Sequence, residues 1–161
     1  MLKSSRTEND IIEIELIDGR FAYAQRLTDP LVGFYPGCYG QRQTVETFEG
    51  QTFRFCVWVH SDAFASARWN VVGTIEPPPN MQNPWFFKQD ALSKKLTLYQ
   101  HQTGKVRTLQ VDELFGYEAA AVWDPEHIEQ RLIDECEGRS NVFVESMKKR
   151  AAADWISRFG S

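Results

Sequence analysis

Apolar and polar residues alternate through the first two thirds of the chain, and this period of two predicts β-strands. The pattern is clearest over residues 52–60, where Phe53, Phe55, Val57 and Val59 share one uniformly apolar face that should point into a core. Turn residues such as Asp18-Gly19 separate the apolar runs. By residue number, strands are expected at 12–17, 20–27, 31–35, 52–60, 69–76, 85–90, 96–101 and 105–111.

In the last third of the chain the apolar positions recur at the spacing of a helix. Asp124 as N-cap and Pro125 at the first helical position open a helix that should end at Glu137, with Gly138 as its stop signal. Its apolar arc is formed by Ile128, Leu132, Ile133 and Cys136. Glu129 projects into that arc, so part of the acidity of this helix is expected to be structural.

A second helix should follow, capped by Ser140 or Asn141. Its apolar stripe consists of Phe143, Val144, Met147, Ala151, Trp155 and Phe159. Shorter helical pieces are expected after Ser61 and at 112–115.

Strands followed by helices predict an α+β fold rather than a parallel βαβ fold. We expect a strongly curved, partly barrel-like antiparallel sheet followed by two C-terminal helices. The 161 residues fit one domain, 1–161, with a flexible segment at 1–9.

Composition favours a protein that stays in the cytoplasm and does not bind membranes. The opening MLKSSRTEND has no apolar run behind its charges, and no apolar stretch approaches the roughly 20 residues that cross a bilayer. Cys38, Cys56 and Cys136 are odd in number and far apart, which predicts reduced thiols rather than disulfides. The chain has no CxxC pair, so a structural zinc site is not expected.

Charge is unevenly distributed along the chain, although the formal net charge is only −4. Residues 112–137 contain nine acids and one base, Arg131. The nine acids are Asp112, Glu113, Glu118, Asp124, Glu126, Glu129, Asp134, Glu135 and Glu137. This acidic segment reads either as a solvated surface or as a site for a cationic partner, which would relieve its self-repulsion.

Catalytic and metal-binding interpretations are weaker. Cys56 and His60 share a strand face but lie roughly 13 Å apart along it, too far for direct activation of the thiol. His60 and Asp62 supply only two ligands for a metal. We therefore expect no catalytic residues, no cofactor and no metal.

Direct nucleic-acid binding is not expected either, because the only basic run is residues 148–150. The five tryptophans, which could stack on bases, are interpreted mainly as core residues.

Three stretches resemble the immunity protein 26 family of bacterial polymorphic toxin systems. They are DIIEIELIDGRFAYAQRLTDPLVGFY, FRFCVWVHSDAFASARWNVVGTIEPP with Trp69 and Gly73, and VWDPEHIEQRLIDECEG. The resemblance covers about Asp10 to Gly138, while the loop from Pro36 to Glu49 and the helix after Ser140 are individual to this chain. It implies an α+β protein that is not an enzyme, binds a toxin and neutralises it. It also makes core residues of Trp69, Phe53 and Phe55.

The resemblance gives the acidic segment a candidate partner, namely the C-terminal domain of a basic, nuclease-type toxin. The expected toxin-binding residues are Asp112, Glu113, Trp123, Glu126, Asp134, Glu135 and Glu137. Trp123 would be the aromatic anchor of this interface. The alternatives are a binding or adaptor domain without a toxin, and a small hydrolase that uses Cys56, His60 or Asp62. The oligomeric state is left open.

Overall fold

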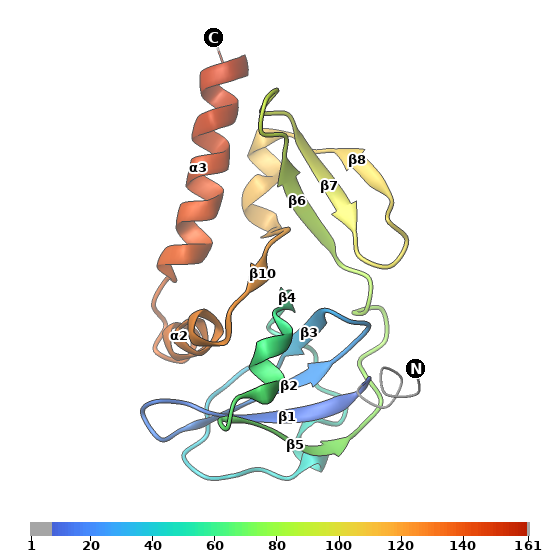
Figure 1. The fold of residues 1–161 in the computed structure, drawn as a ribbon, viewed down its shortest axis with the longest axis vertical. Helices are drawn as coiled ribbons and strands as arrows, with labels where there is room; N and C mark the ends of the chain where they lie inside the picture. The colour runs from blue at the N-terminus through green and yellow to red at the C-terminus, as the bar shows by residue number, and fades with distance from the viewer. Residues whose placement is uncertain (1–7, 161) are drawn as a thin grey trace. The chain divides into compact units, whose positions relative to one another are not determined.

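The structure is a computed structural model that describes residues 8–160 (Figure 1). The chain forms two compact units, each built from two stretches of sequence. Unit 1 comprises Met1–Gln82 and Val122–Arg139, and unit 2 comprises Asn83–Ala121 and Ser140–Ser161. The single domain expected from the sequence stays a prediction. The expected flexible segment 1–9 lies outside the described residues except for Glu8 and Asn9.

Unit 1 contains a six-stranded sheet in the order β10-β4-β3-β2-β1-β5. Its strands are β1 (Asp10–Glu15), β2 (Phe21–Arg26), β3 (Leu31–Phe34), β4 (Phe55–Val59), β5 (Trp69–Thr74) and β10 (Val122–Trp123). Neighbouring strands are antiparallel except β10, which is parallel to β4. The Asp18-Gly19 turn joins β1 to β2 as expected, with Gly19 at a φ of +87° that glycine tolerates best.

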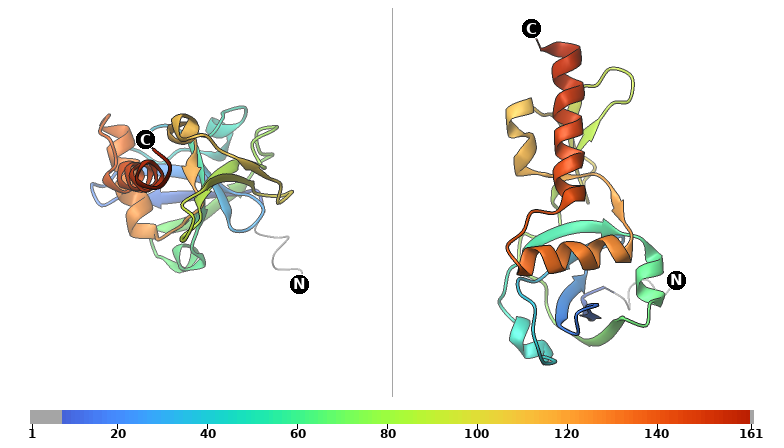
Figure 2. Two further views of the ribbon diagram at one scale, coloured as in Figure 1. Left: turned by 90° about the horizontal axis from the view of Figure 1, so that it is seen from above. Right: turned by 90° about the vertical axis from the view of Figure 1, so that its left-hand side faces the viewer.

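One face of this sheet, the helix face, is covered by α2 (Pro125–Cys136) and the short η2 (Ser61–Ala65). Figure 2 shows α2 in orange. The alternating strand positions on this face include Ile12, Ile14, Ala22, Ala24, Val32, Phe34, Phe55, Val57 and Trp69. Phe34 stacks on Phe55 with their ring centroids 4.8 Å apart and meets the Trp69 ring edge-on. The apolar arc of α2 packs over these buried aromatic pairs and keeps them from water.

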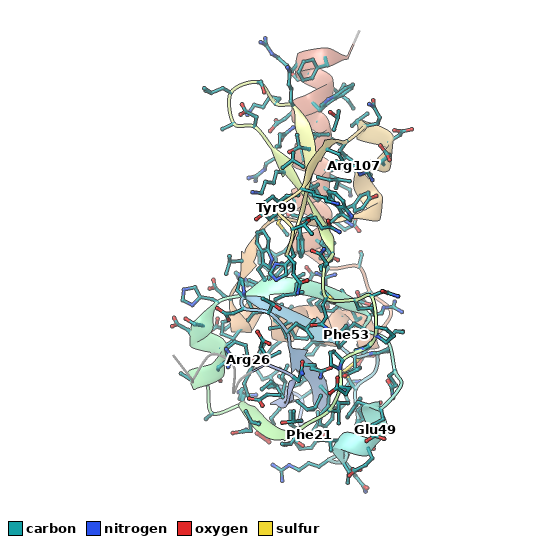
Figure 3. The ribbon with its side chains drawn as sticks, turned by 90° about the vertical axis from the view of Figure 1, so that its right-hand side faces the viewer. Phe21, Arg26, Glu49, Phe53, Tyr99 and Arg107 are labelled. Atoms are coloured by element: carbon teal, nitrogen blue, oxygen red, sulfur yellow. A yellow bond between two sulfur atoms is a disulfide. The ribbon has the colours of Figure 1, made fainter. Side chains whose placement is uncertain are left out.

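The opposite face, the loop face, is covered by residues 36–53, which include η1 (Val45–Phe48). Phe48 and Phe53 pack there against the Tyr35 ring. Phe53, labelled in Figure 3, fills the space that a Cβ on Gly33 would occupy, with ring atoms 2.5 Å from that position. Placing Phe53 on the same face as Phe55 was therefore wrong, because β4 begins only at Phe55 and the chain bends at Arg54.

Buried polar side chains on the loop face satisfy one another. The Tyr35 hydroxyl donates to Gln25 Oε1 at 2.8 Å, and the Gln25 amide donates to the Ile75 carbonyl at 2.6 Å. The Tyr23 hydroxyl donates to buried Glu13 at 2.8 Å and accepts from a backbone N–H. Burial raises the pKa of both tyrosines to about 12.

Unit 2 contains a four-stranded sheet in the order β8-β7-β6-β9, with β9 parallel to β6. Its elements are β6 (Trp85–Gln89), β7 (Leu96–Gln100), β8 (Val106–Thr108), η3 (Val111–Gly116), β9 (Glu118–Ala119) and α3 (Val142–Phe159). Its core joins the sheet, η3 and α3 through Phe87, Leu96, Leu98, Leu109, Leu114 and Ala151.

The expected stripe of α3 is buried only in part. Ala151 is buried and Trp155 packs against the core, but Phe143 and Phe159 are 38% and 42% exposed. Asn141, one of the two expected caps, is the N-cap, and its side chain accepts hydrogen bonds from the N–H groups of Phe143 and Val144.

The α+β class and the two C-terminal helices are confirmed. The barrel-like curvature was wrong, because the strands form two open sheets and neither closes on itself. Helices and loops cover the sheets instead. No helix in the described part of the chain combines the length and apolar character that a bilayer crossing needs.

Replacing Gly33 tests the contact between β3 and the covering loop. Gly33→Ala should lower the free energy of unfolding by about 1–3 kcal/mol, because the new methyl group overlaps the Phe53 ring. Urea denaturation measures the change. Gly40→Ala is the matched control, since a Cβ there meets open space. The loss in Gly33→Ala should shrink when Phe53→Ala is already present, and additive losses would contradict the contact.

Alkaline pH should destabilise unit 1 through its buried tyrosines. A pKa of about 12 in the folded chain, against about 10 when unfolded, contributes stability that is complete below pH 10. That stability disappears as the pH rises toward 12. Tyr35→Phe should remove roughly 1–2 kcal/mol of this pH-dependent loss, measured by urea denaturation at pH 8, 10 and 11.5. Equal pH-dependent losses in the variant and the wild type would contradict this.

Candidate functional site

The seven residues expected to bind a toxin are divided between the two units. Asp112 and Glu113 are exposed on η3 in unit 2. There the Glu113 carboxylate accepts the Gln110 N–H at 3.1 Å and so caps η3. The other five lie on β10, on α2 and at the end of α2 in unit 1: Trp123, Glu126, Asp134, Glu135 and Glu137.

Trp123, expected as the aromatic anchor of a toxin interface, lies in the core of unit 1. It is only 4% exposed, because β10 pairs with β4 and carries the side chain into the core. The Arg131 guanidinium lies 5.2 Å from the Trp123 ring centroid and 3.7 Å from that of Phe55. The only base of the acidic segment is thus buried between aromatic rings as a cation–π contact.

Glu129 has a structural role on the helix face. Its carboxylate accepts a hydrogen bond of 3.0 Å from the indole N–H of Trp69, which is itself buried. A buried indole N–H needs an acceptor, and this need accounts for an acid on the apolar side of α2.

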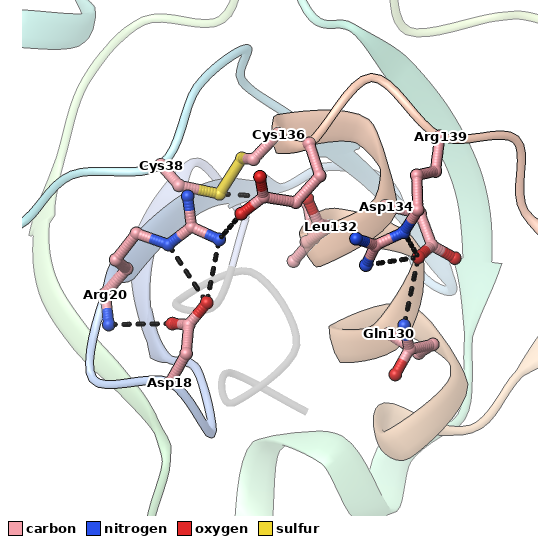
Figure 4. A network of polar contacts seen from close by, with 9 residues as sticks. Asp18, Arg20, Cys38, Gln130, Leu132, Asp134, Cys136 and Arg139 are labelled. Atoms are coloured by element: carbon pink, nitrogen blue, oxygen red, sulfur yellow. Dashed lines mark hydrogen bonds and ion pairs between the residues drawn. A yellow bond between two sulfur atoms is a disulfide. The ribbon is translucent and has the colours of Figure 1, made fainter.

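The last turn of α2 is tethered at three consecutive residues, as Figure 4 shows in part. The Arg54 side chain donates to Glu135 at 2.9 Å, and the Arg20 side chain donates to Glu137 at 2.7 Å. Between them, Cys136 forms a disulfide with Cys38. We call residues 134–139 the α2 terminus. These tethers reach three different segments of unit 1.

Two further contacts complete the α2 terminus. The N–H groups of Gly138 and Arg139 donate to the carbonyls of Glu135 and Asp134, which is a Schellman motif with Gly138 at a φ of +70°. The Asp134 carboxylate, only 7% exposed, accepts from Gln130 and Arg139. Asp134 is therefore bonded within the fold, and its expected role in toxin binding stays a prediction.

The Arg20 side chain also binds the hairpin turn. It donates to Asp18 at 2.7 Å as well as to Glu137. Hydrogen bonds from the side chain and backbone of Arg20 lower the pKa of Asp18. Exposed ion pairs of this kind contribute little to stability.

The Cys38–Cys136 disulfide overturns the expectation of three reduced thiols. Its cysteines are 98 residues apart in sequence but have Cα atoms 6.0 Å apart, within the usual range for a disulfide. Cys56 is the one cysteine of the described residues that lies outside the disulfide, and it is buried. The cysteine count thus gives no support to a reducing compartment, and a cytoplasmic location stays a prediction.

A cavity of about 210 Å³ lies beside the disulfide. Its lining includes Tyr35, Gly37, Arg54, Leu132, Glu135 and Cys136. The Arg54–Glu135 ion pair therefore forms part of its wall, next to the disulfide.

The residues of the hydrolase alternative have local roles. His60 is the N-cap of η2, and its Nδ1 accepts the Asp62 N–H at 3.2 Å. Cys56 lies on the loop face within the sheet. Within residues 8–160, no group of three or more His, Cys, Asp or Glu side chains is placed to hold a metal ion.

Sequence reasoning missed the disulfide and the buried Arg131. The disulfide leaves no local signal, because its partners are brought together only by the packing of α2. Arg131 recurs at the spacing of Ile128 and Leu132 on the wheel, and that position could have indicated its burial.

Comparison of the chain with protein-family models, with curated proteins and with solved structures found no match.

Removing the Glu129 carboxylate tests its structural role. Glu129→Ala should lower the free energy of unfolding by about 1–3 kcal/mol, because the buried Trp69 N–H loses its acceptor. Glu129→Gln keeps an acceptor and should lose less of the free energy of unfolding. Glu126→Ala, at an exposed position of the same helix, is the control and should change stability by less than about 0.5 kcal/mol. Thermal denaturation that failed to separate the two alanine variants would refute this role.

Proposed function

We propose that the protein is an immunity protein that binds and neutralises the C-terminal domain of a basic, nuclease-type bacterial toxin. It would act by stoichiometric binding rather than by catalysis, in the cytoplasm and without binding nucleic acid or membranes itself. The resemblance over about Asp10 to Gly138 to the immunity protein 26 family motivates the proposal. The charge distribution of the folded chain supports it.

The observation that carries the proposal is the separation of charge between the two units. Unit 1 contains 16 Asp and Glu against nine Lys and Arg, a net charge of −7. Unit 2 contains six acids against nine bases, a net charge of +3. A strongly acidic unit attracts a cationic partner over several ångströms and speeds their encounter.

Within unit 1, the exposed side of α2 and its terminus form the surface best suited to such a partner. Glu126 and Glu137 are exposed, and Glu135, two residues before Glu137, is half-buried. Arg20 and Arg54 leave acceptor positions free on the bound carboxylates, since each carboxylate offers about four lone-pair sites. Basic side chains of a nuclease could donate hydrogen bonds at those positions. The carboxylates would then occupy the toxin surface that normally meets phosphates.

A second function, a binding domain without a toxin, is favoured by the apolar surface of unit 2. Four side chains of α3, Val142, Phe143, Ile156 and Phe159, are more than a third exposed, and exposed apolar side chains on one helix can dock into the groove of a partner. Binding to a partner through unit 2 alone, with no effect of acids in unit 1, would favour this alternative.

Co-expression tests the class of function. The C-terminal fragment encoded by the upstream gene should arrest growth when expressed alone. Co-expression of this chain should restore growth, and the two proteins should co-purify in a fixed ratio. Growth arrest that persists despite folded, abundant protein would refute the immunity role.

Charge reversal tests the surface. Glu126→Lys with Glu137→Lys should slow association with the toxin fragment by about tenfold at low salt, because steering by opposite charge is lost. The difference should shrink at high salt. The control, Glu46→Lys with Glu49→Lys, changes net charge equally at exposed positions around η1. Association rates that fall equally in both variants would point to net charge rather than to α2.

A further inference from the structure

We propose that the Cys38–Cys136 disulfide is a redox-sensitive clasp, whose reduction by a dithiol releases the α2 terminus while unit 1 stays folded. The proposal goes beyond toxin binding and can be tested without a toxin.

The disulfide is the only covalent tether of the α2 terminus. The other two tethers, Arg54–Glu135 and Arg20–Glu137, are ion pairs with at least one substantially exposed side chain. Ion pairs of this kind exchange readily with water and give little stability. A disulfide that closes a loop of about 100 residues restricts the chain far more strongly. Without it, the last turn would depend on weak contacts.

The body of α2 is held independently of the disulfide. Ile128 and Leu132 are buried on the helix face, and Arg131 stacks on Phe55. Glu129 is bonded to Trp69. All four positions precede the α2 terminus, so opening the disulfide leaves the apolar anchoring of the helix in place.

The other end of the disulfide is also fixed. Tyr39, next to Cys38, exchanges two backbone hydrogen bonds of 2.8 Å with Phe21 at the start of β2. Gly37, on the other side, turns the chain at a φ of +96°. Because Cys38 sits on this pinned loop, the α2 terminus is the part that moves when the bond opens.

A thiol can reach the bond. Both cysteines are half-buried rather than enclosed, and Cys136 lines the cavity of about 210 Å³. A thiolate of the reductant attacks one sulfur and displaces the other as a thiolate, which gives a mixed disulfide. The second thiol of the reductant then resolves it. Two electrons and two protons pass from the dithiol to the protein, which leaves two cysteine thiols and an oxidised, cyclic reductant.

Hydrogen exchange of the full chain with and without dithiothreitol tests the clasp. The reporters are the backbone N–H groups of Glu137, Gly138 and Arg139, which bond to carbonyls of the last turn. After reduction they should exchange at least about tenfold faster, while the N–H of Leu132 stays within about twofold. Free thiols should rise from one to three per chain. Oxidised glutathione should slow the exchange of these N–H groups again and return the number of free thiols to one.

Two variants make the outcome unambiguous. Cys56→Ser should respond to the dithiol as the wild type does. Cys38→Ser with Cys136→Ser should show fast exchange at the α2 terminus at all times and no response to the dithiol. Unchanged exchange at residues 137–139 after complete reduction would overturn the proposal. Unfolding of unit 1 in the reduced protein, or failure of the double variant to fold, would overturn it equally.

Discussion

Unit 1 depends on burying a highly charged helix against an apolar sheet face, where its Arg131, Glu129 and Asp134 side chains contact aromatic rings or hydrogen-bond partners. Arg131 lies over the rings of Phe55 and Trp123, and Glu129 accepts the indole N–H of Trp69. Asp134 is held by Gln130 and Arg139. Removing one partner would strand a polar group away from water, which costs more than the contact itself contributes. The packing of α2 on the sheet therefore depends on the polar contacts of its own side chains.

On the loop face, too, buried polar side chains pair with one another. Its aromatic cover approaches the sheet closely enough to require glycine at position 33, and Tyr35 and Gln25 satisfy each other beneath that cover. The disulfide then joins the two covering layers, since Cys38 belongs to the loop and Cys136 to α2. Unit 1 is thus a sheet covered on both sides, with a covalent link between its covers.

These constraints shape the proposed interface. Several carboxylates of the acidic segment are used inside the fold, so the charge offered to a partner is smaller than a count along the chain implies. The carboxylates of the α2 terminus are positioned by arginines and by the disulfide, and Glu126 adds an exposed charge on the same helix. A partner would therefore meet a few positioned carboxylates rather than a diffuse acidic surface. The exposed apolar residues of unit 2 are a separate surface with its own chemistry.

The sequence by itself determined the features that rest on neighbouring residues. Strand alternation, the Asp18-Gly19 turn, the start of α2 at Pro125 and the stop at Gly138 follow from local sterics and hydrogen bonding, and the structure confirms them. The tertiary structure alone decided the side of the sheet taken by Phe53, the burial of Trp123, the acceptor role of Glu129 and the pairing of Cys38 with Cys136. Each of these depends on contacts between segments far apart in the chain, and periodicity within one segment carries no information about its distant neighbours.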